Sequence, residues 1–379
     1  MRGGVIRHAI VSSAGRSRVL FALPSLRGGG AERVVVTLLR HLDRERFEPH
    51  LLLVEATGPY LADVPPDVPV HVLAAPRLRR AVFDMVRVIR RVRPAIVVST
   101  QGYMNLALLM LRPFFSRARL IVREVIGERY LENSRFQPLF YRLYLSLVRH
   151  ADRIVVQSDA VRSEMEARLG AATGQVVRVY NPVDTARIDA QVRAAVPARD
   201  GTRPHVVAAG RLGHQKGFDL LLEAFAGVVR VLGQGTLTIL GDGPDRATLE
   251  ARATALGVAA AVRFVGFQDN PFAYFAAADL FVLSSRYEGL PNVLLEALAC
   301  GCPAVAFECP HGVREIVRDG VNGVLVPPED VAALRAAMLR VLQDPDERRR
   351  LAANARASLE PFLSDTIVRK WEALLDEIR

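Results

Sequence analysis

Short apolar runs alternate with longer segments in which apolar residues recur at helical spacing. The runs are typical of buried strands, and the longer segments are typical of amphipathic helices. Strands that alternate with helices in this way indicate βαβ units and a parallel sheet. In the first half, this pattern predicts strands at 18–23, 50–54, 70–73, 95–99, 119–123, 153–156 and 176–179, with helices that include 31–41, 81–92, 136–149 and 158–169.

The alternation breaks near Asn181 and restarts about twenty residues later. The segment 185–203 is rich in Ala and Arg and has little apolar periodicity, so we interpret it as an interdomain linker. Beyond it the pattern predicts strands at 205–209, 236–240, 262–265, 279–283, 303–307 and 323–326, and helices at 217–232, 244–256, 271–277, 291–300, 313–318, 329–342, 345–357 and 361–378.

A chain of 379 residues is too long for one ordinary core. We therefore expect an α/β protein with two Rossmann-like, doubly wound parallel-sheet domains that face each other across a cleft, at residues 18–184 and 204–360. Residues 1–17 are polar and lack the apolar centre of a signal peptide, so we expect a disordered leader there.

Positive charge is concentrated in the first half of the chain. Residues 1–184 hold 28 Arg and 16 acidic residues, a balance of +12, whereas the remainder holds 22 basic and 24 acidic residues, a balance of −2. The excess has two interpretations: a solvated surface of an Arg-rich chain, or attraction to an anionic membrane or a pyrophosphate-bearing acceptor. No run of about 18 uncharged apolar residues predicts a membrane-spanning helix, and no motif predicts nucleic-acid binding.

The segment around 77–93 illustrates both interpretations. Its apolar residues fit either a helix that faces a membrane or an ordinary amphipathic helix packed on the sheet. The basic residues are Arg77, Arg79, Arg80, Arg87, Arg90, Arg91 and Arg93, and the apolar ones include Leu78, Val82, Phe83, Val86 and Ile89.

The stretch Arg286–Gly301 reads R-Y-E-G-L-P-N-V-L-L-E-A-L-A-C-G and follows a predicted strand. Pro291 suits the first turn of a helix and Gly301 suits its end. Glu288 falls in the loop, and Glu296 falls about two turns along the helix. A helix that starts at the carboxyl end of a strand presents free N–H groups, which suit a phosphate.

A second candidate phosphate site is Gly210–Gly217, G-R-L-G-H-Q-K-G, after the first strand of the second domain. Arg211 and Lys216 supply positive charge there. The chain has only two Lys among 50 basic residues, so a Lys at this position is informative. Its compact ammonium suits a phosphate, although a solvated helix start is the simpler alternative.

Other glycine-rich loops are weaker signals. Gly28-Gly29-Gly30 opens the first helix and fits either a close approach to a phosphate or a simple tight turn. Gly241-Asp242-Gly243-Pro244 fits a helix cap, and Gly266-Phe267 ends a strand where it can pack against a nucleobase.

Metal sites are not convincing in this sequence. Cys300, Cys302, Cys309 and His311 have a spacing that resembles a zinc site, but small buried cysteines are the more common explanation. Asp344-Pro345-Asp346 follows a helix and is interpreted as a helix cap. We expect no metal and no cofactor.

Taken together, these motifs resemble a retaining glycosyltransferase of family 4 with the GT-B fold, in its bacterial polysaccharide and glycan-assembly branch. The match rests on G-R-L-x-x-Q-K-G at 210–217, G-D-G-P at 241–244 and E-x7-E at 288–296. Asn181-Pro182-Val183-Asp184, Gln157-Ser158, the Gly28–Glu32 opening and the run at 314–327 extend it over nearly the whole chain after residue 17.

The resemblance implies a function and a set of roles. Residues 18–184 would form the acceptor side, 204–360 would bind a nucleotide sugar, and the helix at 361–379 would pack back toward the first domain. Arg211 and Lys216 would bind the donor diphosphate, and Glu288 would contact the donor sugar. Gly289, Leu290 and Asn292 would hold phosphate and sugar, Glu296 the ribose, Gly28 and Gly29 the phosphate side, and Gly266 and Phe267 the base.

One feature departs from the family pattern. Many relatives carry a histidine in the first domain near the reacting carbon, and this chain has no histidine between 94 and 130. Gln101 and Asn105, after the strand at 95–99, and Glu124, after the strand at 119–123, are candidates for that acceptor-side space.

We therefore expect transfer of a sugar, most simply from a UDP-hexose or UDP-N-acetylhexosamine, to a lipid-linked or oligosaccharide acceptor. The place would be cytoplasmic, at the inner face of the membrane. The alternatives are a GDP-mannose-dependent transferase, a nucleotide-sugar epimerase on the same fold, and a non-catalytic sugar-nucleotide binder.

Overall fold

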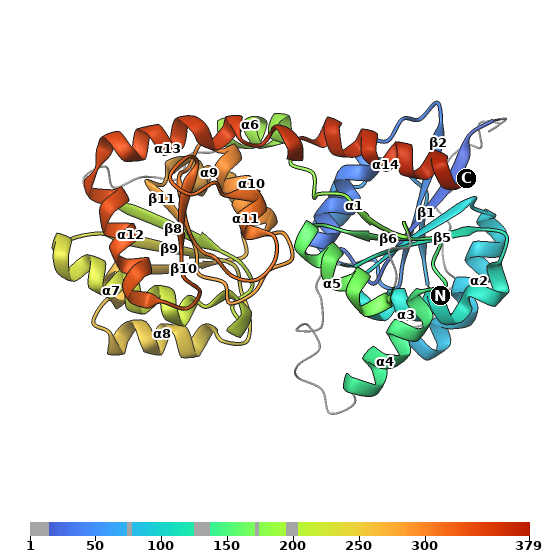
Figure 1. The fold of residues 1–379 in the computed structure, drawn as a ribbon, viewed down its shortest axis with the longest axis horizontal. Coiled ribbons are helices and arrows are strands. Elements are labelled where there is room, and N and C mark those ends of the chain that lie inside the picture. Colours follow the sequence, from blue (N-terminus) through green and yellow to red (C-terminus); the bar gives the residue numbers. More distant parts are fainter. Residues whose placement is uncertain (1–14, 74–77, 125–136, 171–173, 195–203) are drawn as a thin grey trace. The chain divides into compact units, whose positions relative to one another are not determined.

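The computed structural model describes residues 15–73, 78–124, 137–170, 174–194 and 204–379. The chain divides into two compact units (Figure 1). Unit 1 comprises residues 1–182 and 364–379, and unit 2 comprises residues 183–363. Most of the expected leader at 1–17, and 195–203 of the expected linker, lie outside the described residues.

Unit 1 is built on a parallel sheet. Within the described residues its seven strands follow the order β3-β2-β1-β4-β5-β6-β7. The chain runs outward from β1 on one side and then continues from β4 on the other, so the loops after β1 and β4 start at the switch point of the sheet. The strands are β1 (Ser17–Leu23), β2 (Phe47–Leu53), β3 (Val70–Val72), β4 (Ile96–Thr100), β5 (Arg119–Arg123), β6 (Arg153–Val156) and β7 (Val176–Arg178).

Helices cover both faces of this sheet. On one face α1 (Gly30–His41) lies beside the C-terminal helix α14 (Ser364–Ile378), as Figure 1 shows, and both share a core with Val19 and Phe21 of β1. The opposite face packs Leu20 of β1 against the remaining helices. These are α2 (Leu78–Val92), α3 (Gly102–Leu111), α4 (Gln137–Val148) and α5 (Asp159–Leu169), with the 3-10 turn η2 (Arg112–Phe115), whereas the 3-10 turn η1 (Pro59–Asp63) packs on the side of α1.

Two segments differ from the sequence-based expectation. Helix α3 occupies 102–111, between two predicted strands, where the pattern gives no bounds for a helix because the residues are apolar on nearly all sides and show no period. Helix α6 (Thr185–Ala194) occupies the first part of the expected linker and belongs to unit 2. It buries only one side chain, Ile188, and is held by polar contacts such as the double ion pair of Asp189 with Arg356 at 2.7 and 2.6 Å.

Unit 2 repeats the architecture. Its described strands form a parallel sheet in the order β10-β9-β8-β11-β12-β13, so the switch point lies between β8 and β11. The strands are β8 (His205–Ala209), β9 (Thr236–Leu240), β10 (Val262–Gly266), β11 (Leu280–Leu283), β12 (Ala304–Phe307) and β13 (Gly323–Val326).

One core of unit 2 joins α7 (Phe218–Leu232), α8 (Arg246–Ala255) and α12 (Val331–Gln343) to the sheet. Helix α10 (Asn292–Ala299) contacts β11 and β12 and packs against α6 and α9 (Phe272–Ala277). The remaining pieces are α11 (Val313–Ile316), α13 (Pro345–Ala357), η4 (His214–Lys216), η5 (Ala259–Ala261) and η6 (Glu360–Phe362). Among the described residues, no helix combines the length and apolarity needed to cross a bilayer.

Helix α14 gives unit 1 a fluorescent reporter, because Trp371 is the single Trp of the chain and is almost fully buried in the core with α1. Leu375 of the same helix is fully buried. We expect Leu375→Ala to lower the free energy of unfolding of unit 1 by about 2–5 kcal/mol, measured by Trp371 emission in urea. Arg369→Ala, on the exposed face of α14, is the control and should stay within about 0.5 kcal/mol. Equal effects of the two changes would contradict the packing of α14.

Candidate functional site

Two loops meet at the switch point of unit 2. Residues 210–217 follow β8 and residues 284–291 follow β11, the neighbouring strand. Three hydrogen bonds join the loops: Arg286 N donates to Gln215 O at 2.8 Å, Gln215 Nε2 to Tyr287 O at 3.1 Å, and Ser284 Oγ to Lys216 O at 2.9 Å. The two loops therefore form one rigid rim.

Lys216 and Glu288 form an ion pair on this rim. Lys216 Nζ lies 2.5 Å from Glu288 Oε1, and Ser285 Oγ donates to the same oxygen at 2.7 Å. The side chains are only 17% and 7% exposed. An ammonium has three N–H donors, so Lys216 can serve Glu288 and phosphate oxygens together.

Glycines allow this close approach of backbone to backbone. Gly217 has φ +59°, and a Cβ at this position would lie 2.1 Å from Ser284 O. Gly312 N donates to Gly289 O at 2.9 Å, and a Cβ on Gly312 would lie 2.4 Å from that oxygen. Any larger residue at either position would push the two loops away from their present contact.

Arg286 connects this rim to the start of α7, and no role is predicted for it from the sequence. It donates to both carboxylate oxygens of Asp219, at 2.9 and 2.7 Å, and also to His214 O at 2.8 Å. Burial alone would raise the pKa of Asp219, but the hydrogen bonds and charge of Arg286 outweigh it and hold this pKa below its usual value. The sequence signals the loop around Arg286, but nothing signals a partner 67 positions away.

The other residues of unit 2 that are predicted to bind the donor follow strands of the same sheet. Arg211 is exposed in the loop after β8, Leu290 and Glu296 are buried, and Asn292 is the first residue of α10. Gly266 ends β10, and Phe267, which follows it, is 45% exposed.

Three glycines line up along the same strand ends. Gly241 N donates to Gly266 O at 2.8 Å, and a Cβ on Gly241 would lie 2.0 Å from Gly210 O. The loops after β8, β9 and β10 are thus in contact at their first residues. Their contact brings the predicted base-side residues into the same strand-end layer as Arg211.

The three cysteines of unit 2 are free thiols, of which Cys302 and Cys309 are buried and Cys300 is partly buried. Burial, with the negative charge of Glu288 nearby, raises the pKa of Cys309 to about 12. Burial also raises the pKa values of Cys300 and Cys302, so all three stay protonated at neutral pH. In the portion of the chain that the structure describes, no three His, Cys, Asp or Glu side chains are grouped to hold a metal ion.

In unit 1 a buried carboxylate lies under the glycine loop. Glu32, in the first turn of α1, accepts hydrogen bonds from the N–H of Gly29 and from the side chain of Gln101. Burial raises its pKa, and these hydrogen bonds and the charge of Arg123 oppose the rise. A Cβ on Gly29 would lie 2.3 Å from Glu32 Oε2, so glycine is needed here. The N–H of Gly29, predicted to face phosphate, already has an acceptor inside the chain.

The candidates Asn105 and Glu124 are both buried. Asn105 accepts from Ser99 Oγ at 2.7 Å and donates to Arg123 O at 3.1 Å, and it has no exposed surface. Glu124 Oε2 accepts from Tyr144 Oη at 2.5 Å. Asn105 is therefore a structural link between β4, β5 and α3.

Arg123 is also buried, and burial lowers its pKa to about 10. It donates to Asn181 Oδ1 at 2.6 Å and to Thr100 Oγ1 at 3.4 Å, so it ties the ends of β4 and β5 to the segment after β7. Asn181 belongs to the motif Asn181-Pro182-Val183-Asp184, which does not by itself predict this contact with Arg123.

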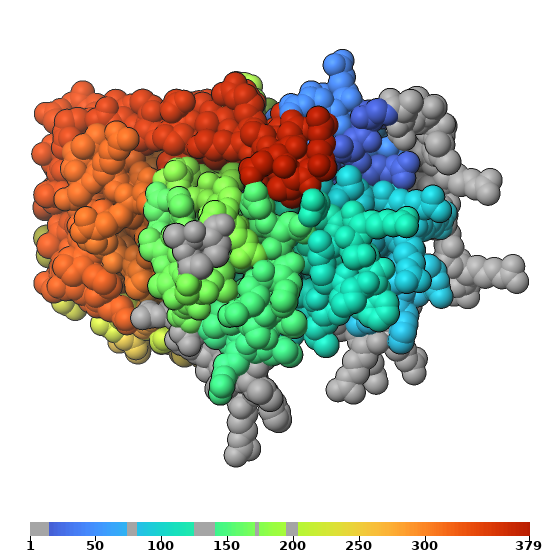
Figure 2. All heavy atoms as spheres, turned by 45° about the vertical axis from the view of Figure 1, so that its right-hand side comes forward, coloured from blue at the N-terminus to red at the C-terminus, as the bar shows by residue number. Residues whose placement is uncertain are grey.

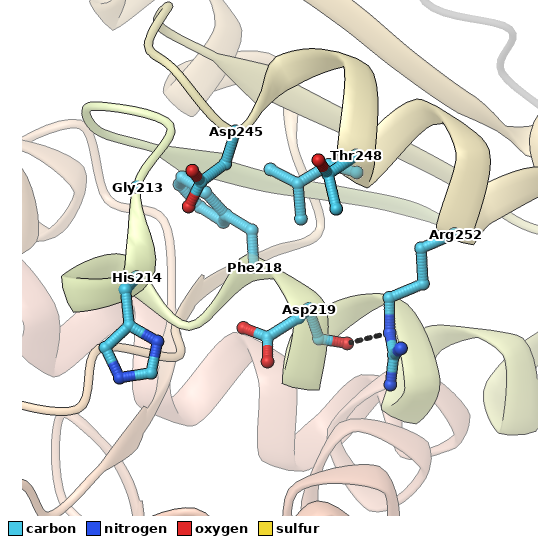
Figure 3. Close-up of a pocket in the computed structure, with 8 residues that line it drawn as sticks. Gly213, His214, Phe218, Asp219, Asp245, Thr248 and Arg252 are labelled. Atoms are coloured by element: carbon cyan, nitrogen blue, oxygen red, sulfur yellow. Dashed lines mark hydrogen bonds between the residues drawn. The ribbon is translucent and has the colours of Figure 1, made fainter.

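A separate pocket of about 280 Å³ lies between the start of α7 and α8. Figure 3 shows His214, Asp219 and Asp245 around it, with Arg252 donating to Asp219 O at 3.3 Å. None of the residues predicted to bind the donor lines this pocket. It borders the loop of Lys216 from the side of the helices.

Comparisons with known proteins agree on one family. A model described as Glycosyltransferase Family 4 matches residues 28–187, and one described as Glycosyl transferases group 1 matches residues 191–358. The chain is 28% identical over 352 residues to an N-acetylgalactosaminyltransferase of Campylobacter jejuni that acts on a diphospho-undecaprenol-linked sugar, covering 89% of this chain and 93% of that protein.

Two further matches are a relative and a solved structure. The lipopolysaccharide core biosynthesis glycosyltransferase LpsE of Rhizobium meliloti is 36% identical over 219 residues, which cover 58% of this chain and 62% of that protein. The fold matches that of Anabaena HepE in complex with UDP-glucose, with a TM-score of 0.82 and 22% identity over 96% of this chain and 100% of that one.

The ion pair of Lys216 and Glu288 can be tested by its energetics. Lys216→Met or Glu288→Gln leaves a buried charge without its partner, and each should destabilise unit 2 by about 3 kcal/mol. The double variant should lose clearly less than the sum, because it leaves no uncompensated charge. Urea unfolding followed by circular dichroism measures this, with Arg230→Met, on the exposed side of α7, as control. Additive losses would contradict the pair.

Proposed function

Because the chain belongs to the family 4 glycosyltransferases of bacterial polysaccharide and lipopolysaccharide synthesis, we propose that it is a retaining enzyme that uses a UDP-sugar. The sugar is a hexose or an N-acetylhexosamine, and the acceptor is a lipid-linked or growing glycan. The observation that carries this proposal is the Lys216–Glu288 pair at the switch point of unit 2, where α/β folds bind ligands.

Each side chain at this switch point has a role in the proposal. Lys216 and Arg211 neutralise the diphosphate as it leaves, with the start of α10 adding backbone N–H groups. Glu288 uses Oε1 for Lys216 and Ser285, and its other oxygen accepts a hydroxyl of the donor sugar. Glu296 accepts from the ribose, and the exposed Phe267 packs on the base.

The reaction breaks the bond between the sugar C1 and the phosphate oxygen, and the diphosphate keeps the electron pair. The acceptor oxygen attacks C1 from the same face and gives its proton to the departing phosphate oxygen. The configuration at C1 is therefore retained, and no carboxylate pair of the glycosidase type is required. In this scheme the two cations supply the charge stabilisation, and no metal takes part.

Two names of similar proteins support the choice of substrates. The solved structure of HepE contains UDP-glucose, and the Campylobacter jejuni relative acts on a diphospho-undecaprenol-linked sugar. A UDP-sugar and a polyprenyl-diphosphate-linked glycan are therefore the first donor and acceptor to test, with GDP-mannose as the competing donor.

The experiment is a donor panel with the full chain: UDP-glucose, UDP-galactose, their N-acetylhexosamine counterparts and GDP-mannose. Released nucleotide is scored with and without a bacterial membrane lipid extract as acceptor source. We expect a UDP-sugar to give the fastest release. Absence of release from every donor would overturn the proposal, and preference for GDP-mannose would correct the donor.

Lys216→Ala should lower nucleotide release by roughly 10²-fold or more, because it removes a cation that stabilises the leaving group. Arg230→Ala, an exposed Arg of α7 in the same unit, is the matched control and should keep full activity. Full turnover by Lys216→Ala would remove the phosphate-binding role from this residue.

We further propose that unit 1 binds the inner face of an anionic membrane through the outer surface of α2, α3, η2 and α4. Figure 2 shows this part of the molecule, in cyan and green. Phe83, Met110, Phe114 and Leu143 expose 76%, 57%, 56% and 42% of their area there. Residues 82–119 carry seven Arg and one acidic residue, Asp84, and Arg87, Arg90 and Arg91 are exposed, so helix α2 combines basic groups with the exposed Phe83.

We expect this surface to bind phosphatidylglycerol vesicles, because each basic group near anionic lipid contributes about 1 kcal/mol. Binding should weaken as the salt concentration rises, since salt screens this attraction. Phe83→Ser with Phe114→Ser should weaken binding about tenfold or more by removing apolar insertion. Val231→Ser, which changes a 60% exposed apolar residue of unit 2, is the control. Equal vesicle sedimentation of all three proteins would exclude this surface as the membrane contact.

A further inference from the structure

Gln101 has an unusual backbone conformation. It joins β4 to α3 with φ +74° and ψ +133°. Its ψ lies outside the small left-handed well that other residues use, in a region that glycine occupies readily. The next residue is Gly102, yet the strained position is held by Gln. Strain of this kind gathers at functional sites, where the surrounding structure enforces it.

The neighbours of Gln101 enforce its conformation from both sides. Asn105 N donates to Gln101 O at 2.9 Å and closes the first turn of α3. The Asn105 side chain then ties that turn to Ser99 of β4 and to the carbonyl of Arg123 at the end of β5. The backbone at 101 therefore cannot relax without moving a fully buried polar link.

This conformation brings the Gln101 side chain to Glu32. The Gln101 side chain hydrogen-bonds the Glu32 carboxyl group, and in the ionised form of that carboxyl the amide NH₂ of Gln101 is the donor. The orientation of the amide is thereby set. Its second N–H and its carbonyl oxygen form a donor and acceptor pair, and Gln101 is only partly buried.

Gln101 and Glu32 follow β4 and β1, the two strands at the switch point of unit 1. Of the three acceptor-side candidates, Asn105 is fully enclosed and Glu124 is buried against Tyr144, whereas Gln101 keeps accessible surface. The geometry thus singles out one of the three for contact with a ligand.

We propose that Gln101 is an acceptor-binding residue, whose amide, oriented by Glu32, hydrogen-bonds a hydroxyl or acetamido group of the acceptor sugar. This inference rests on the glycosyl transfer proposed above. In this proposal the strained backbone at 101 is what positions the amide. Gln101→Gly relieves the strain and removes the amide, so its effects on stability and on acceptor binding can be distinguished.

The test compares Gln101→Gly with the unchanged chain, using the best donor and titrated membrane lipid extract. We expect an unchanged or higher Tm. The amount of extract that gives half-maximal stimulation should rise tenfold or more. Gln101→Asn keeps an amide one methylene shorter and should recover part of the stimulation.

Arg93→Gly is the control for Tm, because Arg93 is another non-glycine residue of unit 1 with positive φ, +49°. Unchanged stimulation in Gln101→Gly would overturn the inference. A fall in Tm together with lost activity would also overturn it, since Gln101 would then be a structural link. Absence of nucleotide release from the unchanged chain would instead reject the proposed function itself.

Discussion

Each of the two described parallel sheets has one point where its strand order reverses, and in both sheets side chains connect the segments that follow the two strands at that point. In unit 2 the loops after β8 and β11 are joined by Lys216 and Glu288. In unit 1 the loops after β1 and β4 are joined by Glu32 and Gln101. The same topological constraint has been met by an ion pair in one unit and by a carboxylate–amide contact in the other.

An ion pair that is largely buried needs fixed surroundings, because its desolvation is offset only when the geometry is maintained. In unit 2 this geometry is maintained by residues other than Lys216 and Glu288. Arg286 donates two hydrogen bonds to the carboxylate of Asp219. Gly217 has no Cβ, so the backbone at 217 can lie close to the carbonyl oxygen of Ser284. The residues that would do the chemistry thus depend on residues that would touch no substrate.

The sequence allowed the alternating architecture and the family to be predicted, because strand periodicity and the loops G-R-L-G-H-Q-K-G and R-Y-E-G-L-P are local signals. It did not allow the bounds of α3 to be predicted, since a helix that is apolar on nearly all sides has no period. The positive φ of Gln101 could not be predicted either, because a Gln followed by Gly102 does not indicate a strained backbone. The Arg286–Asp219 contact depends on two strands being neighbours, and no local pattern encodes that.

The two helix starts at these switch points differ in their electrostatics. At the start of α1 an internal carboxylate, Glu32, accepts from Gly29 N–H, where an external anion would otherwise bind. At the loops of unit 2, by contrast, Lys216 keeps donors beyond Glu288, and Arg211 is exposed. In the proposed function, a diphosphate would therefore find its charge complement in unit 2. In the same proposal the first unit, whose helix start already has Glu32 as an internal acceptor, would receive the uncharged hydroxyl groups of the acceptor sugar.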